Sequence, residues 1–244
     1  MSNIPRLSFS ILPEKDISTF FSFVEEAGFD GGRNLEWAVF KNHLNLKKFF
    51  RDHEFIGKKS DIASYVSEIY NRDRDVMKDR LKQYEEKWRV AEPVYFAGVH
   101  ALFDSSFWPE GKYIAFPTVW GMYPRFLEDK TFQLPYEPAN RADILFIIAH
   151  EMLHFIFYEY FLAKHQEYRN EDSDFFLWHV SEIFNTIVQN SASWPQEMNN
   201  REAGYPEHEN IVKELSKKYG SISKENLDAF ILDIVQSVKK QPGF

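Results

Sequence analysis

Residues 147–156 place a His-Glu-x-x-His motif inside an apolar run, and this stretch most constrains how the chain can fold. Apart from the two histidines and the glutamate, every residue in it is uncharged, so the segment has the character of a buried helix. On a helix, His150 and His154 lie one turn apart and leave the same face. A polar triad is costly in such a segment unless it is paired or bound to a metal.

The spacing of the two histidines suits two nitrogen ligands on one zinc ion. Glu151 follows His150 by about 100° around the helix, so its carboxylate can reach a water on the metal without binding the metal. The sequence therefore predicts a Zn²⁺ site at His150 and His154 with Glu151 as a general base. The alternative is a pair of core histidines that are satisfied by hydrogen bonds.

The motif and its helix resemble the active-site helix of the zincin metallopeptidases, and residues 94–190 resemble that family more loosely. The resemblance implies an α+β fold that is mainly helical, with a small mixed β-sheet packed on the active-site helix. It also implies hydrolysis of a peptide or protein substrate by a zinc-bound water that Glu151 activates. Two alternatives stay open: a catalytically inert zincin-like protein that binds peptides or regulates, and hydrolysis of a non-peptide amide.

The third zinc ligand separates the zincin groups. A third histidine in the extended motif is excluded, because Phe157 and Tyr160 stand at the glycine and histidine positions. In gluzincins the third ligand is a glutamate from the following helix, and by this resemblance Glu182 is the candidate. Helical spacing agrees, because Glu182 lies opposite an apolar face. That face is formed by Phe176, Val180, Ile183, Phe184 and Ile187. Alternatives near the end of the motif helix are Glu159, Glu167 and Glu171.

The side chains near Glu182 supply candidates for the oxyanion donor. His179 precedes Glu182 by one turn on nearly the same face, so it is either another third ligand or a hydrogen-bond donor to the developing oxyanion. Tyr158, Tyr205 and His208 are further candidates for that donor.

The gluzincin pattern Asn-Glu-x-x-Ser-Asp around the third ligand is incomplete. Thr186 stands where the pattern has the Asp that orients a ligand histidine, so that Asp is missing here. Asn185 is the expected partial substitute. Asn185 and Gln189 share the polar face of Glu182.

The rest of the chain reads as helices around a small sheet. One long helix is expected from residue 60 or 61 until Pro93 ends it, followed by a strand at 94–99. Phe132–Leu134 is expected by resemblance to be an edge strand that pairs with a bound peptide, the alternative being an ordinary hairpin strand. The other expected elements are strands at 7–12 and 113–116, and helices at 13–27, after Asn34, from Pro138 or Asn140 to 161, at 174–189 and, in two pieces, at the C-terminus.

Composition limits the partners. A length of 244 residues allows a helical region at 1–90 and a zincin-like region at 91–244, or one continuous domain. The net charge of −8 argues against nucleic acid and anionic membranes as partners. The chain has no cysteine, so zinc must be held by histidine and carboxylate. The N-terminus has no signal-peptide pattern, and a cytoplasmic location is expected.

Overall fold

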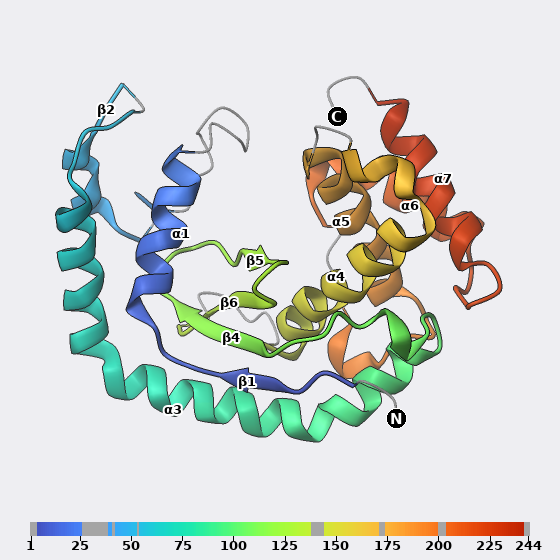
Figure 1. Ribbon diagram of the computed structural model, residues 1–244, viewed down its shortest axis with the longest axis horizontal. Helices are drawn as coiled ribbons and strands as arrows, with labels where there is room; N and C mark the ends of the chain where they lie inside the picture. The colour runs from blue at the N-terminus through green and yellow to red at the C-terminus, as the bar shows by residue number, and fades with distance from the viewer. Residues whose placement is uncertain are drawn as a thin grey trace. The chain divides into compact units, whose positions relative to one another are not determined.

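The computed structural model is mainly helical with a small mixed sheet, as predicted (Figure 1). It describes residues 4–25, 39–40, 42–52, 54–137, 144–170, 174–199 and 204–241. The start of the helix expected after Asn34 and the start expected at Pro138 or Asn140 lie outside these residues, whereas residues 39–40 are described and helical.

The chain forms two compact units. Unit 1 comprises Met1–Pro5, Lys87–Gly111 and Ala142–Phe244, and unit 2 comprises Arg6–Glu86 and Lys112–Arg141. These bounds differ from the expected division at residues 90 and 91, because the sheet segment belongs with the first 80 residues.

The sheet of unit 2 has four strands in the order β1, β4, β6, β5. Their bounds are Leu7–Phe9, Tyr113–Thr118, Thr131–Pro135 and Arg125–Phe126. β1 and β6 run parallel to β4, whereas β5 is antiparallel to β6. β6 is buried throughout, as is usual for a parallel strand covered on both faces.

The expectation that Phe132–Leu134 form an edge strand is wrong. β6 pairs with β4 along its whole length, and on its other side Thr131 and Phe132 pair with β5. The Gln133 amide then donates to the Pro124 carbonyl at 3.0 Å. Strand addition by a peptide needs free backbone groups along one side of a strand, and β6 does not offer such a side.

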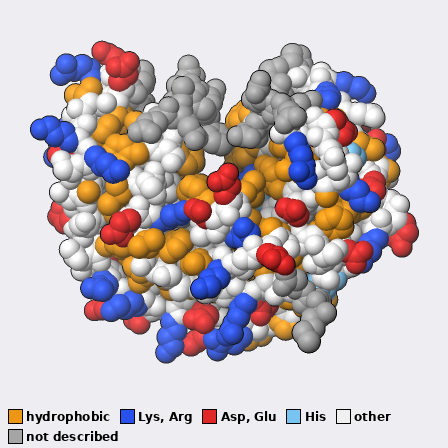
Figure 2. Space-filling view, in the orientation of Figure 1, with side chains coloured by type: hydrophobic (Ala, Val, Ile, Leu, Met, Phe, Trp, Pro, Cys, Tyr) orange, Lys and Arg blue, Asp and Glu red, His pale blue; other side chains and the backbone are white. Residues whose placement is uncertain are grey.

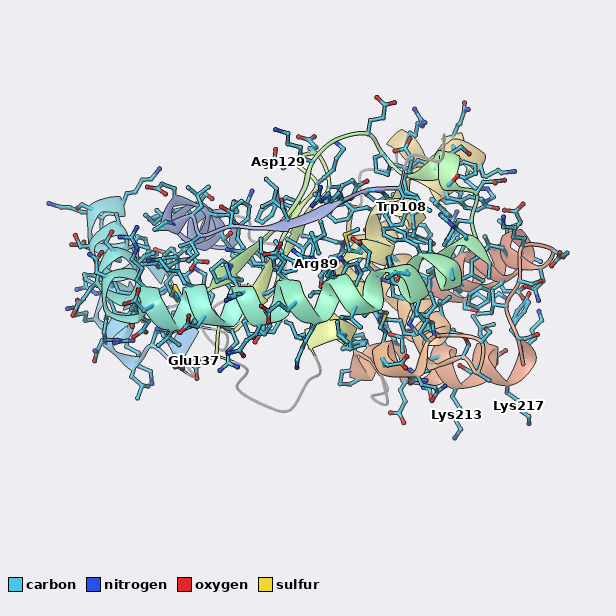
Figure 3. All side chains as sticks on the ribbon, turned by 90° about the horizontal axis from the view of Figure 1, so that it is seen from below. Arg89, Trp108, Asp129, Glu137, Lys213 and Lys217 are labelled. Atoms are coloured by element: carbon cyan, nitrogen blue, oxygen red, sulfur yellow. The ribbon has the colours of Figure 1, made fainter. Side chains whose placement is uncertain are left out.

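One helix, α3 (Lys59–His100), replaces the predicted helix and the strand that was expected after it. Pro93 lies inside α3, so the prediction that it ends the helix is wrong, and residues 94–99 belong to the last turns. Residues up to Glu86 belong to unit 2, and the remainder belongs to unit 1. Figure 3 shows the helix along its length, with the exposed Arg89 labelled.

Burial explains why α3 continues through the proline. A proline inside a helix costs about 3 kcal/mol or more. Trp88, Tyr95, Phe96 and Val99 are all at most 5 % exposed, and burying each large apolar side chain contributes roughly 1.5–3 kcal/mol. Their spacing is helical, and the rings of Trp88 and Tyr95 contact each other with centroids 5.1 Å apart. Together these contacts outweigh the cost of Pro93.

Unit 1 gathers four helices around its own core (Figure 1). They are α4 (Ile144–Lys164), α5 (Asp174–Asn190), α6 (Glu209–Lys218) and α7 (Leu227–Lys239). α7 is amphipathic, and its inner face buries Leu227, Phe230, Ile231, Ile234, Val235 and Val238. α4 is long and apolar enough by composition to span a membrane, but 67 % of that stretch is buried, as in the core helix of a folded protein.

α6 is amphipathic. It buries Ile211 and Leu215, while Lys213 and Lys217 project outward from it (Figure 3). Acidic and basic side chains are interspersed on the face turned to the viewer in Figure 2, as expected of solvated helix surfaces.

Short elements complete the described chain. They are the helix α1 (Pro13–Glu25), the hairpin β2 (Phe50–Arg51) and β3 (Glu54–Phe55), and the 3₁₀ turns η2 (Leu44–Phe49), η3 (Ser105–Phe107), η4 (Gln166–Asn170), η5 (Gln196–Met198) and η6 (Pro206–His208).

A buried carboxylate joins α1 to the sheet of unit 2. Asp16 is fully buried and accepts hydrogen bonds from Tyr70 Oη at 2.9 Å, Val119 N at 2.9 Å and Gln133 Nε2 at 2.7 Å. Burial raises the pKa of Asp16 to about 6, although these donors act to lower it. Asp16 therefore holds three segments that are distant in sequence.

Replacing Asp16 by alanine should lower the free energy of unfolding by about 3 kcal/mol or more, because three buried donors lose their acceptor. Urea denaturation followed by circular dichroism measures this change. The control is E14A, which removes an exposed carboxylate from the same helical turn and should change stability by less than about 0.5 kcal/mol. Equal stability of D16A and E14A would contradict the role given to Asp16.

Candidate metal centre

α4 and α5 bring three predicted ligands together. His150 Nε2 lies 3.0 Å from His154 Nε2 and 3.1 Å from Glu182 Oε2, and His154 Nε2 lies 3.4 Å from Glu182 Oε1. Among the described residues, these three form the group of histidine, aspartate and glutamate side chains that could hold a metal ion.

The spacing of the ligand atoms fits zinc. Nitrogen and oxygen ligands about 2.0–2.1 Å from a tetrahedral zinc are separated from one another by about 3.3 Å. The three observed separations, 3.0, 3.1 and 3.4 Å, are close to that edge length. Two imidazoles and one carboxylate are also a donor set that zinc accepts in catalytic sites.

The site is buried on most sides. The His154 and Glu182 side chains are 0 % and 5 % exposed, whereas the His150 side chain keeps 16 % of its surface exposed. A buried carboxylate is stable only when it is paired or bound to a cation. Within the group, the largest remaining exposure is therefore that of His150.

Glu182 and His150 shift each other's pKa in opposite directions. Burial alone would raise the pKa of Glu182, but the charge of His154 and the hydrogen bond from His150 hold it well below its usual value. Burial alone would lower the pKa of His150, but the hydrogen bond and charge of Glu182 raise it. The pair therefore favours a carboxylate beside an imidazolium, and a bound cation would take the place of the proton between them.

Glu151 lies next to the metal group without belonging to it. Its side chain is 7 % exposed on α4, and its charge contributes to the raised pKa of His150. This placement is compatible with the predicted general base, which must reach a water rather than the metal.

His179 and His208 pair with each other. Nδ1 of His179 lies 2.7 Å from Nε2 of His208, and neither side chain is more than 2 % exposed. Burial lowers the pKa of each to about 4, and for His179 the charge of His208 adds to this effect. Both rings are neutral at pH 7, so His179 can serve as a hydrogen-bond donor only as a neutral imidazole. It does not join His150, His154 and Glu182 in the metal group.

The loop that carries His208 is fixed against α5 by a close backbone approach. Gly204 has a φ of +76°, and a Cβ atom there would lie 2.8 Å from Thr186 Oγ1. Glycine is required at position 204, because another side chain would be strained at this φ and its Cβ would clash with Thr186. Thr186, which occupies the position of the gluzincin Asp, therefore contacts this loop.

The other candidates lie apart from the ligand group. Glu159 and Glu167 are exposed and do not belong to it, and Glu171 lies outside the described residues. Tyr158 is near the ligands, since its ring centroid lies 6.4 Å from that of His154 and its hydroxyl accepts a hydrogen bond from Ser181 Oγ at 3.3 Å. Tyr205 keeps 44 % of its surface exposed.

Gln189 contacts Nδ1 of His150, which is the ring nitrogen outside the ligand group. Its Oε1 lies 2.8 Å from His150 Nδ1. Asn185, the expected substitute for the missing Asp, instead donates from Nδ2 to the backbone carbonyl of His150 at 3.1 Å. Gln189 follows Glu182 by seven residues, which is two helical turns, so this spacing was the available signal.

Comparison with protein-family models, with curated proteins and with solved structures gave no match to this chain.

Replacing Glu182 by alanine should lower the affinity for zinc at least about 100-fold, because the change removes the only negatively charged ligand of the group. Competition with a chromogenic chelator measures the dissociation constant. The control E159A removes an exposed carboxylate from α4 and should bind zinc as the wild type does. Equal affinities of E182A and E159A would exclude Glu182 as a ligand.

Zinc affinity should fall as the pH falls, because zinc must displace a proton from His150. The pKa of His150 is raised, so the decline should begin above the pH at which an ordinary histidine is half protonated, about 6.5. Chelator competition between pH 8.5 and 5.5 tests this. The zinc dissociation constant should rise about tenfold per pH unit of acidification for each proton that zinc displaces. An affinity that is constant down to pH 6 would contradict it.

Proposed function

We propose that this protein is a zinc-dependent hydrolase of the zincin-like, gluzincin type that cleaves peptide bonds. The observation that carries the proposal is the convergence of His150, His154 and Glu182 within 3.0–3.4 Å of one another. Glu151 on the same helix supplies the carboxylate that such a reaction needs. In the metal-free alternative the positive charge beside the buried Glu182 has to come from protonated His150 and His154, and such a buried ion pair carries a large desolvation cost.

In this mechanism, zinc held by the three ligands would polarise a water molecule and lower its pKa towards neutrality. Glu151 accepts a proton from the attacking water and returns it to the leaving amine. Its position on α4, one residue after His150, keeps its carboxylate beside the metal group and outside it.

The developing oxyanion requires a hydrogen-bond donor, and two side chains are candidates. His179 is neutral and held by His208, while Tyr158 lies beside the ring of His154. Replacing each in turn, as H179A and Y158F, separates their contributions to turnover.

We expect the substrate to be a peptide or protein and the location to be cytoplasmic. The peptide would be held by surfaces other than β6, because both sides of that strand are paired. The net charge of −8 argues against nucleic acid as a partner.

An inert peptide-binding or regulatory protein is the second candidate. It is favoured by Thr186 at the position of the gluzincin Asp, which leaves one ligand histidine without its usual carboxylate partner. Under this proposal purified protein would bind peptides, with a structural metal or with none, but leave a peptide library uncleaved.

Replacing Glu151 by glutamine should leave zinc binding within a few-fold of wild type and reduce peptide hydrolysis by about 10²–10⁴-fold, because the amide cannot accept the proton of the water. Zinc content by mass spectrometry and cleavage of a mixed peptide library by zinc-loaded protein give the two readouts. The control E159Q makes the same change on the exposed side of α4 and should retain full activity. Undiminished hydrolysis by E151Q would refute the mechanism.

A further inference from the structure

Gln189 lies where α4, α5 and the η5 turn meet. Its side chain is fully buried. The carboxamide oxygen lies 2.8 Å from His150 Nδ1, and the carboxamide nitrogen lies 3.4 Å from the Phe146 carbonyl and 3.5 Å from the Met198 carbonyl. All the polar atoms of this side chain therefore face polar groups of the protein.

The two backbone carbonyls fix the orientation of the carboxamide. A carbonyl oxygen only accepts hydrogen bonds, so the NH₂ group must face Phe146 and Met198. Turning the amide over would place its oxygen against two other oxygens. The oxygen of Gln189 therefore faces His150, and His150 Nδ1 must carry a proton to donate to it.

This proton determines which nitrogen of His150 is free to bind a metal. A neutral imidazole carries one proton, so a proton on Nδ1 leaves the lone pair on Nε2. Nε2 is the atom that lies 3.0 Å from His154 Nε2 and 3.1 Å from Glu182 Oε2. We infer that Gln189 is a positioning residue, which fixes the tautomer and the ring orientation of His150 and thereby makes Nε2 the metal ligand. This inference rests on the metal centre proposed above.

The segment that anchors Gln189 is itself held firmly. Trp194 Nε1 donates to the same Met198 carbonyl at 3.2 Å, and Trp194 is 3 % exposed. α3 approaches this segment closely, because a Cβ atom on Gly98 would lie 3.1 Å from the Pro195 ring. Gln189 therefore connects the ring of His150 to a rigid part of unit 1.

The backbone at His150 is held separately by Asn185. Its Nδ2 donates to the His150 carbonyl, whereas Gln189 contacts the ring. The two amides of α5 thus hold different parts of one residue, and of the two only Gln189 contacts the ring.

Three variants test the inference. Q189M keeps a similar volume and removes the acceptor, so it should weaken zinc binding by about 10–100-fold, the usual effect of losing a partner of a ligand histidine. Q189E keeps an acceptor for His150 Nδ1, so it should bind zinc about ten times more tightly than Q189M, although its second oxygen would face the carbonyls of Phe146 and Met198. The control N190A removes a neighbouring amide that donates to the Thr186 carbonyl, and it should bind zinc as the wild type does.

A second readout does not depend on zinc. Long-range ¹H–¹⁵N correlation spectra of the zinc-free wild type, recorded above the pH at which the His150 ring becomes neutral, should show its one proton on Nδ1, and the proton should move to Nε2 or exchange between the two nitrogens in Q189M but not in N190A. An unprotonated Nδ1 in the wild type would overturn the inference, even if Q189M failed to fold. Zinc binding by Q189M that matched the wild type would overturn it as well.

The outcomes separate this inference from the proposed function. If the wild type bound no zinc, the metal centre would be wrong, and the protonation of Nδ1 would still decide whether Gln189 holds His150. If the wild type bound zinc and Q189M bound it equally well, the metal centre would stand and the positioning role would be wrong.

Discussion

The carboxylate of Glu182 between two buried imidazoles is the interaction on which unit 1 depends. A carboxylate that is 4 % exposed is unstable in an apolar interior unless positive charge lies beside it. His150 and His154 supply that charge as partly protonated rings, and a divalent cation would supply it more completely. The rest of the unit serves to hold α4 and α5 at the distance where this contact forms.

Apolar packing around α4 and α5 sets that distance, and the Phe184 ring of α5 lies 4.7 Å from the Phe157 ring of α4. α5 turns Val180, Ile183 and Phe184 away from the metal group, and all three are fully buried. Phe184 contacts Phe230 of α7, with ring centroids 5.7 Å apart. Because packed interiors deform little, a polar group held between two such helices keeps its geometry before any ligand binds. The candidate site is therefore pre-organised by the core.

Local patterns predicted the parts of this site that depend on one helix alone. The spacing of His150 and His154, and the face that carries Glu182, follow from helical periodicity. Two features could not be read in this way. α3 continues through Pro93 because its aromatic side chains are buried by segments far along the chain. β6 is paired by β5, which has only two residues and therefore no sequence pattern that would predict a strand. The contact of Gln189 with His150 likewise depends on how α4 and α5 pack.

A neutral amide beside His150 suits the charges of this centre. With zinc bound and Glu151 ionised, the two positive charges of the metal are balanced by Glu182 and Glu151. A carboxylate at position 189 would add a third negative charge in a fully buried position, next to the carbonyls of Phe146 and Met198. Gln189 accepts the proton of His150 Nδ1 without that charge, and its NH₂ group satisfies the two carbonyls. Thr186, which cannot act as a carboxylate acceptor, is thus compatible with an oriented His150, because the orienting group comes from the next turn of the same helix.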